Sequence, residues 1–360
     1  MNILSLFDGI SCCRVALERA NIQVDKYYAS EIDKYAIQVA QHNYPDTIQL
    51  GDINNWRNWK IDWASIDLVA GGSPCQGFSN AGKGLNFDDP RSALFFVFVD
   101  ILNHIRNVNP NVKFLLENVK MKKEWLDIIS KWLNVEPVEI NSSLVSAQNR
   151  QRFYWTNIAK IPQPEDKHIY LKHILITANT IRIPEYGNGE KSRPLTCHYS
   201  NNFGGWYDRI TDPNPNKQQI DILAQYVHSL DKLVKVSESN FAQERHLIQN
   251  INGKCSCLLA RDYKDPKCVF TEIKLFEEQK TGKNVFEVKD KKVIIYDKEY
   301  KMDLEDGFWC FRKLTPIECE RLQTLPDNYT DGISNSQRYK ALGNGWTVDV
   351  IAHIFSFLKK

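Results

Sequence analysis

The strongest constraint on the fold is a repeated pattern in the first 160 residues, in which short apolar runs end abruptly at glycine or polar residues. The predicted strands are Asn2–Phe7, Lys26–Ser30, Ile66–Ala70 and Val112–Leu116, and helical stretches such as Arg14–Ala20 lie between them. This alternation is typical of a parallel sheet covered by helices, and therefore of an α/β, Rossmann-like fold. Ligands of such sheets collect beyond the carboxyl ends of the strands, so the residues that follow these runs are the first candidates for a site.

The rest of the chain has a different texture. The stretch 161–311 is rich in Gly, Pro, Asn and aromatic residues, and Asn284–Val288 and Lys289–Tyr296 predict the hairpins of a smaller, β-rich part. Thr315-Pro316-Ile317-Glu318 forms a capping box with proline at the first helical position, and Val348–Leu358 has the period of a closing helix. We therefore predict a catalytic and cofactor-binding domain at 1–160, an inserted domain at 161–311, and a segment at 312–360 that returns to the first domain.

The composition excludes disordered, collagen-like and fibrous chains, because 42% of the residues are hydrophobic and 25% are charged. A net charge of +2 gives no global basic field, although a local cleft could still bind nucleic acid. The chain has no apolar run of about 18 residues and no secretory leader, so we expect no membrane contact and a cytoplasmic location. Its nine irregularly spaced cysteines should be reduced, and Cys255-x-Cys257 with Cys268 is too sparse for zinc, so we expect no metal.

The first two strand ends favour a nucleotide-like ligand. Small residues in Phe7-Asp8-Gly9-Ile10-Ser11 would let such a ligand approach the backbone and the next helix N-terminus. Glu31, followed by Ile32, comes 22 residues after Gly9, and an acid about 20 residues on is where a ribose diol is expected. Asp52, before Ile53, could contact an adenine edge. Taken singly, the Gly9 turn and Glu31 are equally compatible with a tight turn and a solvated acid, because the triple-glycine fingerprint is absent. Asp52 taken alone is more readily a plain turn aspartate.

The third strand end is more specific. Cys75 lies in Gly72-Ser73-Pro74-Cys75-Gln76-Gly77, directly after a buried strand, which places it on a loop and not in a core. Reactive cysteines need such partial exposure, whereas most cysteines are small buried hydrophobes. The loop Gln76–Ser92, with its glycines and Lys83, can act as a lid over a bound substrate.

Two further strand ends carry an acid and a cation pair. Glu117, in Glu117-Asn118-Val119, emerges from an apolar strand, and desolvation there would keep a proton available. Gln148, Arg150 and Arg152 alternate along one predicted strand, so their side chains should project together. A lone acid or arginine pair is often a surface ion pair, but a nucleophile, an acid and a cation fork at three ends of one sheet argue for a catalytic centre.

Together these residues resemble the C5-cytosine DNA methyltransferase family over nearly the whole chain apart from the middle. The match includes Ser73-Pro74-Cys75-Gln76, Asp89-Pro90-Arg91 through Leu94-Phe95, Glu117-Asn118-Val119, the Gln-x-Arg-x-Arg run, and Leu342-Gly343-Asn344 with Trp346-Thr347-Val348. Ser11, Cys12 and Cys13 replace the usual further glycines of the first motif, as in the subgroup with the animal de novo enzymes and some phage enzymes. Gly345 stands where a small polar residue is common.

The resemblance implies a Rossmann-like methyltransferase sheet and transfer of a methyl group from S-adenosylmethionine to C5 of a flipped-out cytosine in duplex DNA. Cys75 would add to C6, Glu117 would act at N3, and Arg152, supported by Arg150, would hold O2. The residues implied for the cofactor are Phe7, Asp8, Gly9, Ile10, Ser11, Glu31, Ile32, Asp52, Ile53, Pro74, Leu94, Asn344, Trp346 and Thr347. We expect a monomer, with a restriction endonuclease of the same site as the implied partner.

The residues that read DNA are predicted mainly in the insert, where Lys254–Lys264 alternates basic with small and aromatic residues and Arg193–Thr196 is a second candidate. Either stretch could instead be a solvated face. The residues predicted to contact DNA are Gln76, Ser79, Lys83, Asn118, Gln148, Arg193, Arg261 and Lys264.

Three alternatives differ in substrate or class. RNA-acting relatives carry a second proline before the cysteine, whereas this chain has Ser73-Pro74-Cys75, and its large insert favours duplex DNA. An inactive DNA-binding relative is disfavoured by the intact Cys75, Glu117 and Arg152. A cysteine hydrolase is disfavoured because no histidine lies in a motif that could serve Cys75.

Overall fold

The computed structural model describes residues 1–74, 90–158, 160–176, 253–264, 266–273, 285–295, 297–301 and 304–358, together with residues 226, 228 and 249. Within these ranges, no helix combines the length and the apolar character that a bilayer crossing requires.

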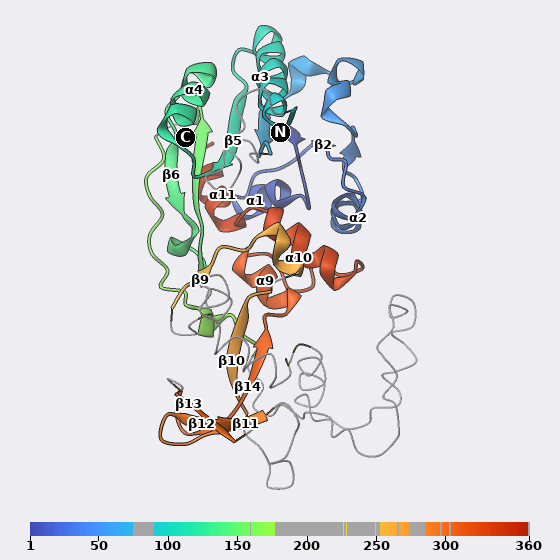
Figure 1. The fold of residues 1–360 in the computed structure, drawn as a ribbon. Coiled ribbons are helices and arrows are strands. Elements are labelled where there is room, and N and C mark those ends of the chain that lie inside the picture. Colours follow the sequence, from blue (N-terminus) through green and yellow to red (C-terminus); the bar gives the residue numbers. More distant parts are fainter. Residues whose placement is uncertain are drawn as a thin grey trace, which may run out of the picture.

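A seven-stranded sheet in the order β3-β2-β1-β4-β5-β8-β6 is the centre of the molecule (Figure 1). Its strands are β1 (Asn2–Leu6), β2 (Lys26–Ser30), β3 (Ile48–Gln49), β4 (Leu68–Gly71), β5 (Lys113–Val119), β6 (Val138–Asn141) and β8 (Gln151–Thr156). The five strands from β3 to β5 are mutually parallel, and β8 runs antiparallel to both β5 and β6. The chain leaves in opposite directions from β1 and β4, so the carboxyl ends of these two strands form the topological switch point, where α/β sheets bind their ligands.

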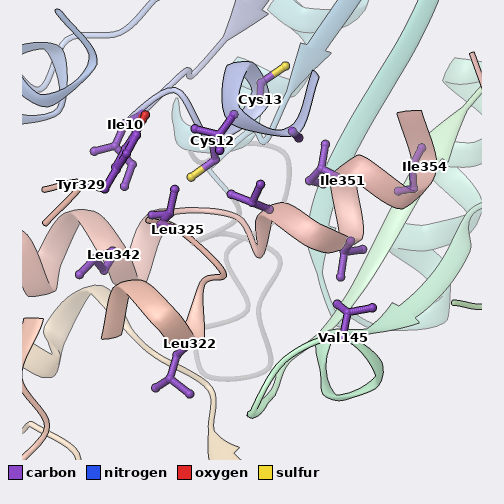
Figure 2. Packing of buried hydrophobic residues seen from close by; sticks show 14 of the residues in the cluster. Ile10, Cys12, Cys13, Val145, Leu322, Leu325, Tyr329, Leu342, Ile351 and Ile354 are labelled. Atoms are coloured by element: carbon purple, nitrogen blue, oxygen red, sulfur yellow. The ribbon is translucent and has the colours of Figure 1, made fainter. Parts of the chain in front are cut away.

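Helices cover both faces of this sheet because successive strand residues point to opposite sides. Ile3 faces a core that includes α1 (Cys12–Arg19), α2 (Lys34–Asn43) and α11 (Val348–Phe355), whereas Leu4 faces a core with α3 (Pro90–Val108) and α4 (Lys123–Leu133). Figure 2 shows Ile351 and Ile354 of α11 in the same cluster as Cys12 and Cys13 of α1. The α/β, Rossmann-like prediction is confirmed, and the last helix does pack against the first.

A smaller β-rich part lies beyond one end of the sheet (Figure 1). Strands β10 (Cys268–Ile273), β14 (Gly307–Lys313) and β11 (Val285–Val288) form an antiparallel sheet, and β12 (Lys292–Ile295) and β13 (Lys298–Lys301) form a hairpin. Phe286, Val293 and Phe311 are among the residues of its separate core. The predicted hairpin segments are therefore strands, while the boundaries at 160 and 311 remain predictions.

A buried ion pair joins this part to the C-terminal helices. Arg312 at the end of β14 and Glu318 in α9 (Pro316–Leu322) are both fully buried, and each guanidinium Nη lies 2.8 Å from one carboxylate oxygen. The predicted capping box is confirmed, because Thr315 Oγ1 accepts from the Glu318 amide at 3.1 Å and Glu318 accepts from the Thr315 amide at 2.7 Å. One carboxylate thus fixes both the start of α9 and the end of β14.

The turn that follows residue 259 packs backbone to backbone against α10 (Asn335–Asn344). This turn, η5 (Ala260–Tyr263), passes so close to Gly343 that a Cβ atom there would lie 2.1 Å from the carbonyl carbon of Leu259. Only glycine fits, so the glycine of the last motif serves the packing of η5 against α10.

Gly343→Ala should therefore lower the free energy of unfolding by about 1–3 kcal/mol, because the backbone of η5 has to move away. Ser336→Ala, at an exposed position of the same helix, should change it by less than about 0.5 kcal/mol. Urea denaturation of both variants tests the contact. Equal stabilities would show that α10 and η5 do not approach this closely.

Candidate functional site

The site lies at the carboxyl ends of the central strands, as the sequence predicted. β4 ends at Gly71 and leads through Gly72 and Ser73 to Pro74, beyond which Cys75 lies outside the described residues. Glu117 and Asn118 belong to β5, the neighbour of β4, and Arg152 belongs to β8, the next strand. The loop between α10 and α11 adds Trp346 from the far end of the chain.

The carboxyl group of Glu117 has a polar partner on each oxygen. Oε1 lies 2.9 Å from Nε of Arg152, and Oε2 accepts a hydrogen bond of 3.1 Å from the indole Nε1 of Trp346. Glu117 is only 8% exposed. Burial works against the charge on Arg152, but the carboxylate of Glu117 raises the pKa of Arg152 above its ordinary value, so the guanidinium stays a cation. Glu117 is therefore not surrounded by apolar groups alone, as its strand suggested, because Arg152 and Trp346 contact its carboxyl group.

Gln148, Arg150 and Arg152 project to the same side of the chain, as predicted, although they do not belong to one strand. Gln148 and Arg150 bond to the backbone of Leu258, and the guanidinium groups of Arg150 and Arg152 lie 3.3 and 3.8 Å from Cys257 Sγ. Gln148 belongs to a separate short strand, β7 (Gln148–Asn149), which pairs with β9 (Cys255–Ser256), and Arg150 lies in the break before β8. Only Arg152 reaches Glu117. The single predicted strand is therefore two short strands, and the chain changes partner strand at Arg150.

Arg150 has an internal role. It is 4% exposed, and its guanidinium donates to the carbonyl oxygens of Leu258 (2.9 Å), Gly345 (3.0 Å) and Gly343 (3.4 Å). It therefore ties together two chain segments that border the site, which fits the supporting role predicted for it.

Gln148 and Asn118, which are predicted to contact DNA, are also buried. Gln148 is fully buried, donates to Leu322 O at 3.2 Å, and accepts from the Leu258 amide at 2.8 Å. Asn118 is 2% exposed and accepts from the Val119 amide at 2.8 Å. Their amide groups are used within the protein.

At the switch point, the turn after β1 is shaped for a ligand. Phe7, Gly9 and Ser11 all have positive φ angles (57°, 60° and 59°), so the chain turns sharply as it leaves the strand. The Glu31 carboxylate accepts from the amides of Gly9 (2.8 Å) and Ile32 (2.7 Å), and from that of Asp33 (2.8 Å). Ile32 itself is 75% exposed, which leaves an apolar surface beside an acid, as an adenosine-like group requires.

Several of the other residues predicted for the cofactor are internal. Asp8 accepts hydrogen bonds from Ser11 and Tyr27, and burial raises its pKa. Ile10 and Ile53 lie in the two hydrophobic cores, and Thr347 is 2% exposed. Five of the predicted residues are therefore buried and support the site without offering a surface to a ligand: Asp8, Ile10, Ser11, Ile53 and Thr347.

The remaining predicted positions differ in how open they are. Asp52 accepts from the Asn54 amide at 2.9 Å and so caps the helix η1 (Ile53–Asn58). Phe7, Pro74 and Leu94 are half-buried, and Asn344 is exposed. Phe7, Pro74, Leu94 and Asn344 therefore keep some exposed surface that a ligand can contact, unlike the five buried residues.

The residues predicted to recognise DNA are described only in part. Arg261 and Lys264 are exposed on and directly after η5, whereas Lys254 of the same stretch points inward and donates to the carbonyl oxygens of Ser143 and Ile169 at 2.6 Å. Gln76, Ser79, Lys83 and Arg193 lie outside the described residues.

Two features escaped the sequence reasoning. The contact between Trp346 and Glu117 joins residues 229 positions apart, and no local pattern signals it. Lys120, Lys122 and Lys123 are exposed directly after β5, and three lysines within four residues of Val119 are a sequence sign of an anionic partner.

Comparisons with known proteins point to the same family that the sequence motifs resemble. A family model described as C-5 cytosine-specific DNA methylase matches residues 1–360. The chain is 26% identical to the orphan methyltransferase M.SPRI of Bacillus phage SPR, covering 99% of this chain and 97% of that protein. It is 28% identical to the type II methyltransferase M.NlaX of Neisseria lactamica, with coverages of 99% and 96%.

Solved structures share the fold. The Entamoeba histolytica methyltransferase EhMeth aligns with a TM-score of 0.61 at 16% identity, over 100% of this chain and 99% of that one. The S. pombe Dnmt2 methyltransferase aligns with a TM-score of 0.57 at 14% identity, over 100% and 98%.

The internal role of Arg150 can be tested by stability alone. Arg150→Met should lower the free energy of unfolding by about 2–4 kcal/mol, because buried carbonyl groups lose their donor. Arg57→Met is a matched control, since the Arg57 side chain is 69% exposed, and it should cost less than about 1 kcal/mol. Equal urea midpoints for the two variants would contradict the internal role.

Proposed function

Because the chain belongs to the C-5 cytosine-specific DNA methylase family and is a DNA cytosine methyltransferase, we propose that Cys75 bonds to C6 of a flipped-out cytosine and that S-adenosylmethionine is the methyl donor. One observation supports this most. The strand that leads into Cys75 ends beside a paired acid and cation, Glu117 and Arg152, held 2.9 Å apart at the same edge of the sheet.

In this proposal the two charged side chains stabilise the adduct of Cys75. The thiolate forms a bond to C6, the C5–C6 double bond breaks, and its electron pair makes C5 nucleophilic. Glu117 supplies a proton to N3, and the cationic Arg152 holds O2 as negative charge develops. The proton returns from N3 to Glu117 when C5 accepts the methyl group. Water then takes the proton from C5, and the electron pair left behind restores the C5–C6 double bond as the thiolate leaves C6.

The turn after β1 and the end of β2 fit S-adenosylmethionine, which when bound supplies the methyl group. Glu31 would accept from the ribose hydroxyls while it holds the Gly9 turn, and the exposed Ile32 would cover a face of the adenine. Asp52 at the end of β3 would contact the adenine edge, and Phe7, Pro74, Leu94 and Asn344 would line the remainder.

DNA recognition is proposed for the insert at 161–311, between the catalytic segments 1–160 and 312–360. The catalytic side chains converge on one base, so neighbouring bases need other readers, and Arg261 would read a base edge while Lys264 contacts a phosphate. Gln76, Ser79, Lys83 and Arg193 would add further contacts. Lys120, Lys122 and Lys123 would hold backbone phosphates beside the flipped base, whose extrusion costs about a few kcal/mol.

The proposed partner is duplex DNA bound by a monomer. Relatives of this chain are named both type II and orphan methyltransferases, and a restriction endonuclease that cuts at the same site is the proposed functional counterpart.

A covalent trap tests the nucleophile. Duplex DNA in which 5-fluorocytosine replaces every cytosine should form an adduct that survives denaturation, because fluorine at C5 cannot leave as a proton does. Cys75→Ser should abolish both the adduct and turnover. Cys257→Ser is the control, since this half-buried thiol lies 3.8 Å from Arg152, and it should leave the adduct intact. An adduct of unchanged yield with the Cys75 variant would exclude Cys75 as the nucleophile.

Calorimetry tests the cofactor site. Glu31→Ala should weaken S-adenosylmethionine binding by roughly tenfold or more, because a lost hydrogen bond to a charged group costs about 1.5–3 kcal/mol. A cofactor analogue that lacks the ribose hydroxyls should bind the parent weakly and should lose little more in the variant. If the variant discriminates between cofactor and analogue as strongly as the parent does, Glu31 does not contact the ribose.

A further inference from the structure

We propose that Trp346 is a positioning residue for Glu117: its indole N–H holds one carboxylate oxygen and thereby keeps the acid directed toward the target base. The inference rests on the proposed role of Glu117 at N3. It assigns to Trp346 a function other than the cofactor contact that the sequence predicts.

The two carboxylate oxygens of Glu117 have different partners. Trp346 Nε1 donates to Oε2 at 3.1 Å, while Nε of Arg152 lies 2.9 Å from Oε1. A guanidinium prefers to bind both oxygens of a carboxylate in a planar fork. Without the indole donor, Arg152 could take both oxygens and rotate the carboxyl group toward itself. The indole prevents this by holding the second oxygen away from β8.

Hydrogen bonds fix the residues on either side of Trp346. The carbonyl oxygen of Gly345 accepts from Arg150 at 3.0 Å and from Gln323 at 3.1 Å. The hydroxyl of Thr347 donates to Gln323 at 3.0 Å and accepts from Ser142 at 2.9 Å. These bonds are buried, so the indole reaches Glu117 from a rigid support, as preorganised catalytic groups require.

Gly72 leaves space for the contact between Trp346 and Glu117, because it has no side chain. A Cβ atom at this position would lie 2.9 Å from Oε2 of Glu117 and 2.9 Å from Nε1 of Trp346, the two atoms that form the hydrogen bond. Even a methyl group would push one of them away. The glycine that precedes the nucleophile loop therefore makes room for this contact.

The test is Trp346→Phe, which keeps an aromatic ring and removes the N–H. The single-turnover methylation rate, measured at saturating S-adenosylmethionine and duplex DNA, should fall by about tenfold to a hundredfold, the range for losing a hydrogen bond to a charged group. Dissociation constants for both ligands should change by less than about threefold. If instead cofactor binding weakens and the saturated rate stays at the parental value, Trp346 lines the cofactor and the proposal is wrong.

A double-mutant cycle shows whether the effect passes through the acid. Glu117→Gln alone should slow the same step by about 10²–10⁴-fold. Adding Trp346→Phe to this variant should cost less than about twofold further, because there is no acid left to orient. Independent, multiplicative losses would overturn the proposal. A fast Glu117→Gln enzyme would instead refute the proposed role of Glu117, so the two failures are distinguishable.

Two further variants exclude a general packing effect. Trp155→Phe removes the same kind of indole hydrogen bond, here 3.0 Å to Ser130 in the core, and should keep the parental rate at saturation. Gly72→Ala should reproduce the rate loss of Trp346→Phe with intact ligand affinity, even if one of the two variants folds poorly. Full activity of Gly72→Ala would contradict the proposed contact.

Discussion

The arrangement of the site depends on one buried cation, the guanidinium group of Arg150. Arg150 donates to backbone carbonyl groups of Leu258, Gly343 and Gly345, and so joins the strand region near residue 150 to two segments more than 100 residues away. A buried guanidinium loses much of its hydration, and these carbonyl oxygens replace water as its acceptors. Because the carbonyls belong to the loop that carries Trp346 and to the approach to η5, their positions are set together.

The elements of the sheet could be predicted from the sequence because their signals are local. Lys26–Ser30 is a strand at the predicted residues, and the capping box at Thr315 starts a helix with both of its hydrogen bonds formed. The first helix begins at Cys12, two residues before the predicted Arg14. The start of this helix is set by the left-handed backbone conformation of Ser11, which the pattern of apolar side chains does not predict.

The side chains of the site were less predictable, because their partners lie far away in the sequence. Gln148 and Arg150 were predicted to form a polar strand face with Arg152, but hydrogen bonds to Leu258, more than 100 residues away, bury both of them. Asp8 and Thr347 stand in motifs typical of ligand contact, yet their polar groups bond to Ser11 and to Gln323. A motif identifies which residues surround a site, whereas burial and long-range pairing decide which of them face the ligand.

Glu117 and Arg152 illustrate why such a site is assembled from several segments. Their side chains are only 11% and 13% exposed, so both charges are largely desolvated, and such a pair adds little to stability compared with apolar packing. The pair instead provides a fixed direction for a carboxylate and a cation, in a setting where water screens both only weakly. A carboxylate held by one arginine alone would tend toward the symmetric fork, in which both oxygens face the guanidinium. Directing it outward requires a second donor on another element, and the C-terminal loop supplies it only because the chain returns to the first domain. The return of the chain to the sheet after β14, through α9, α10 and α11, therefore serves the site as well as the core.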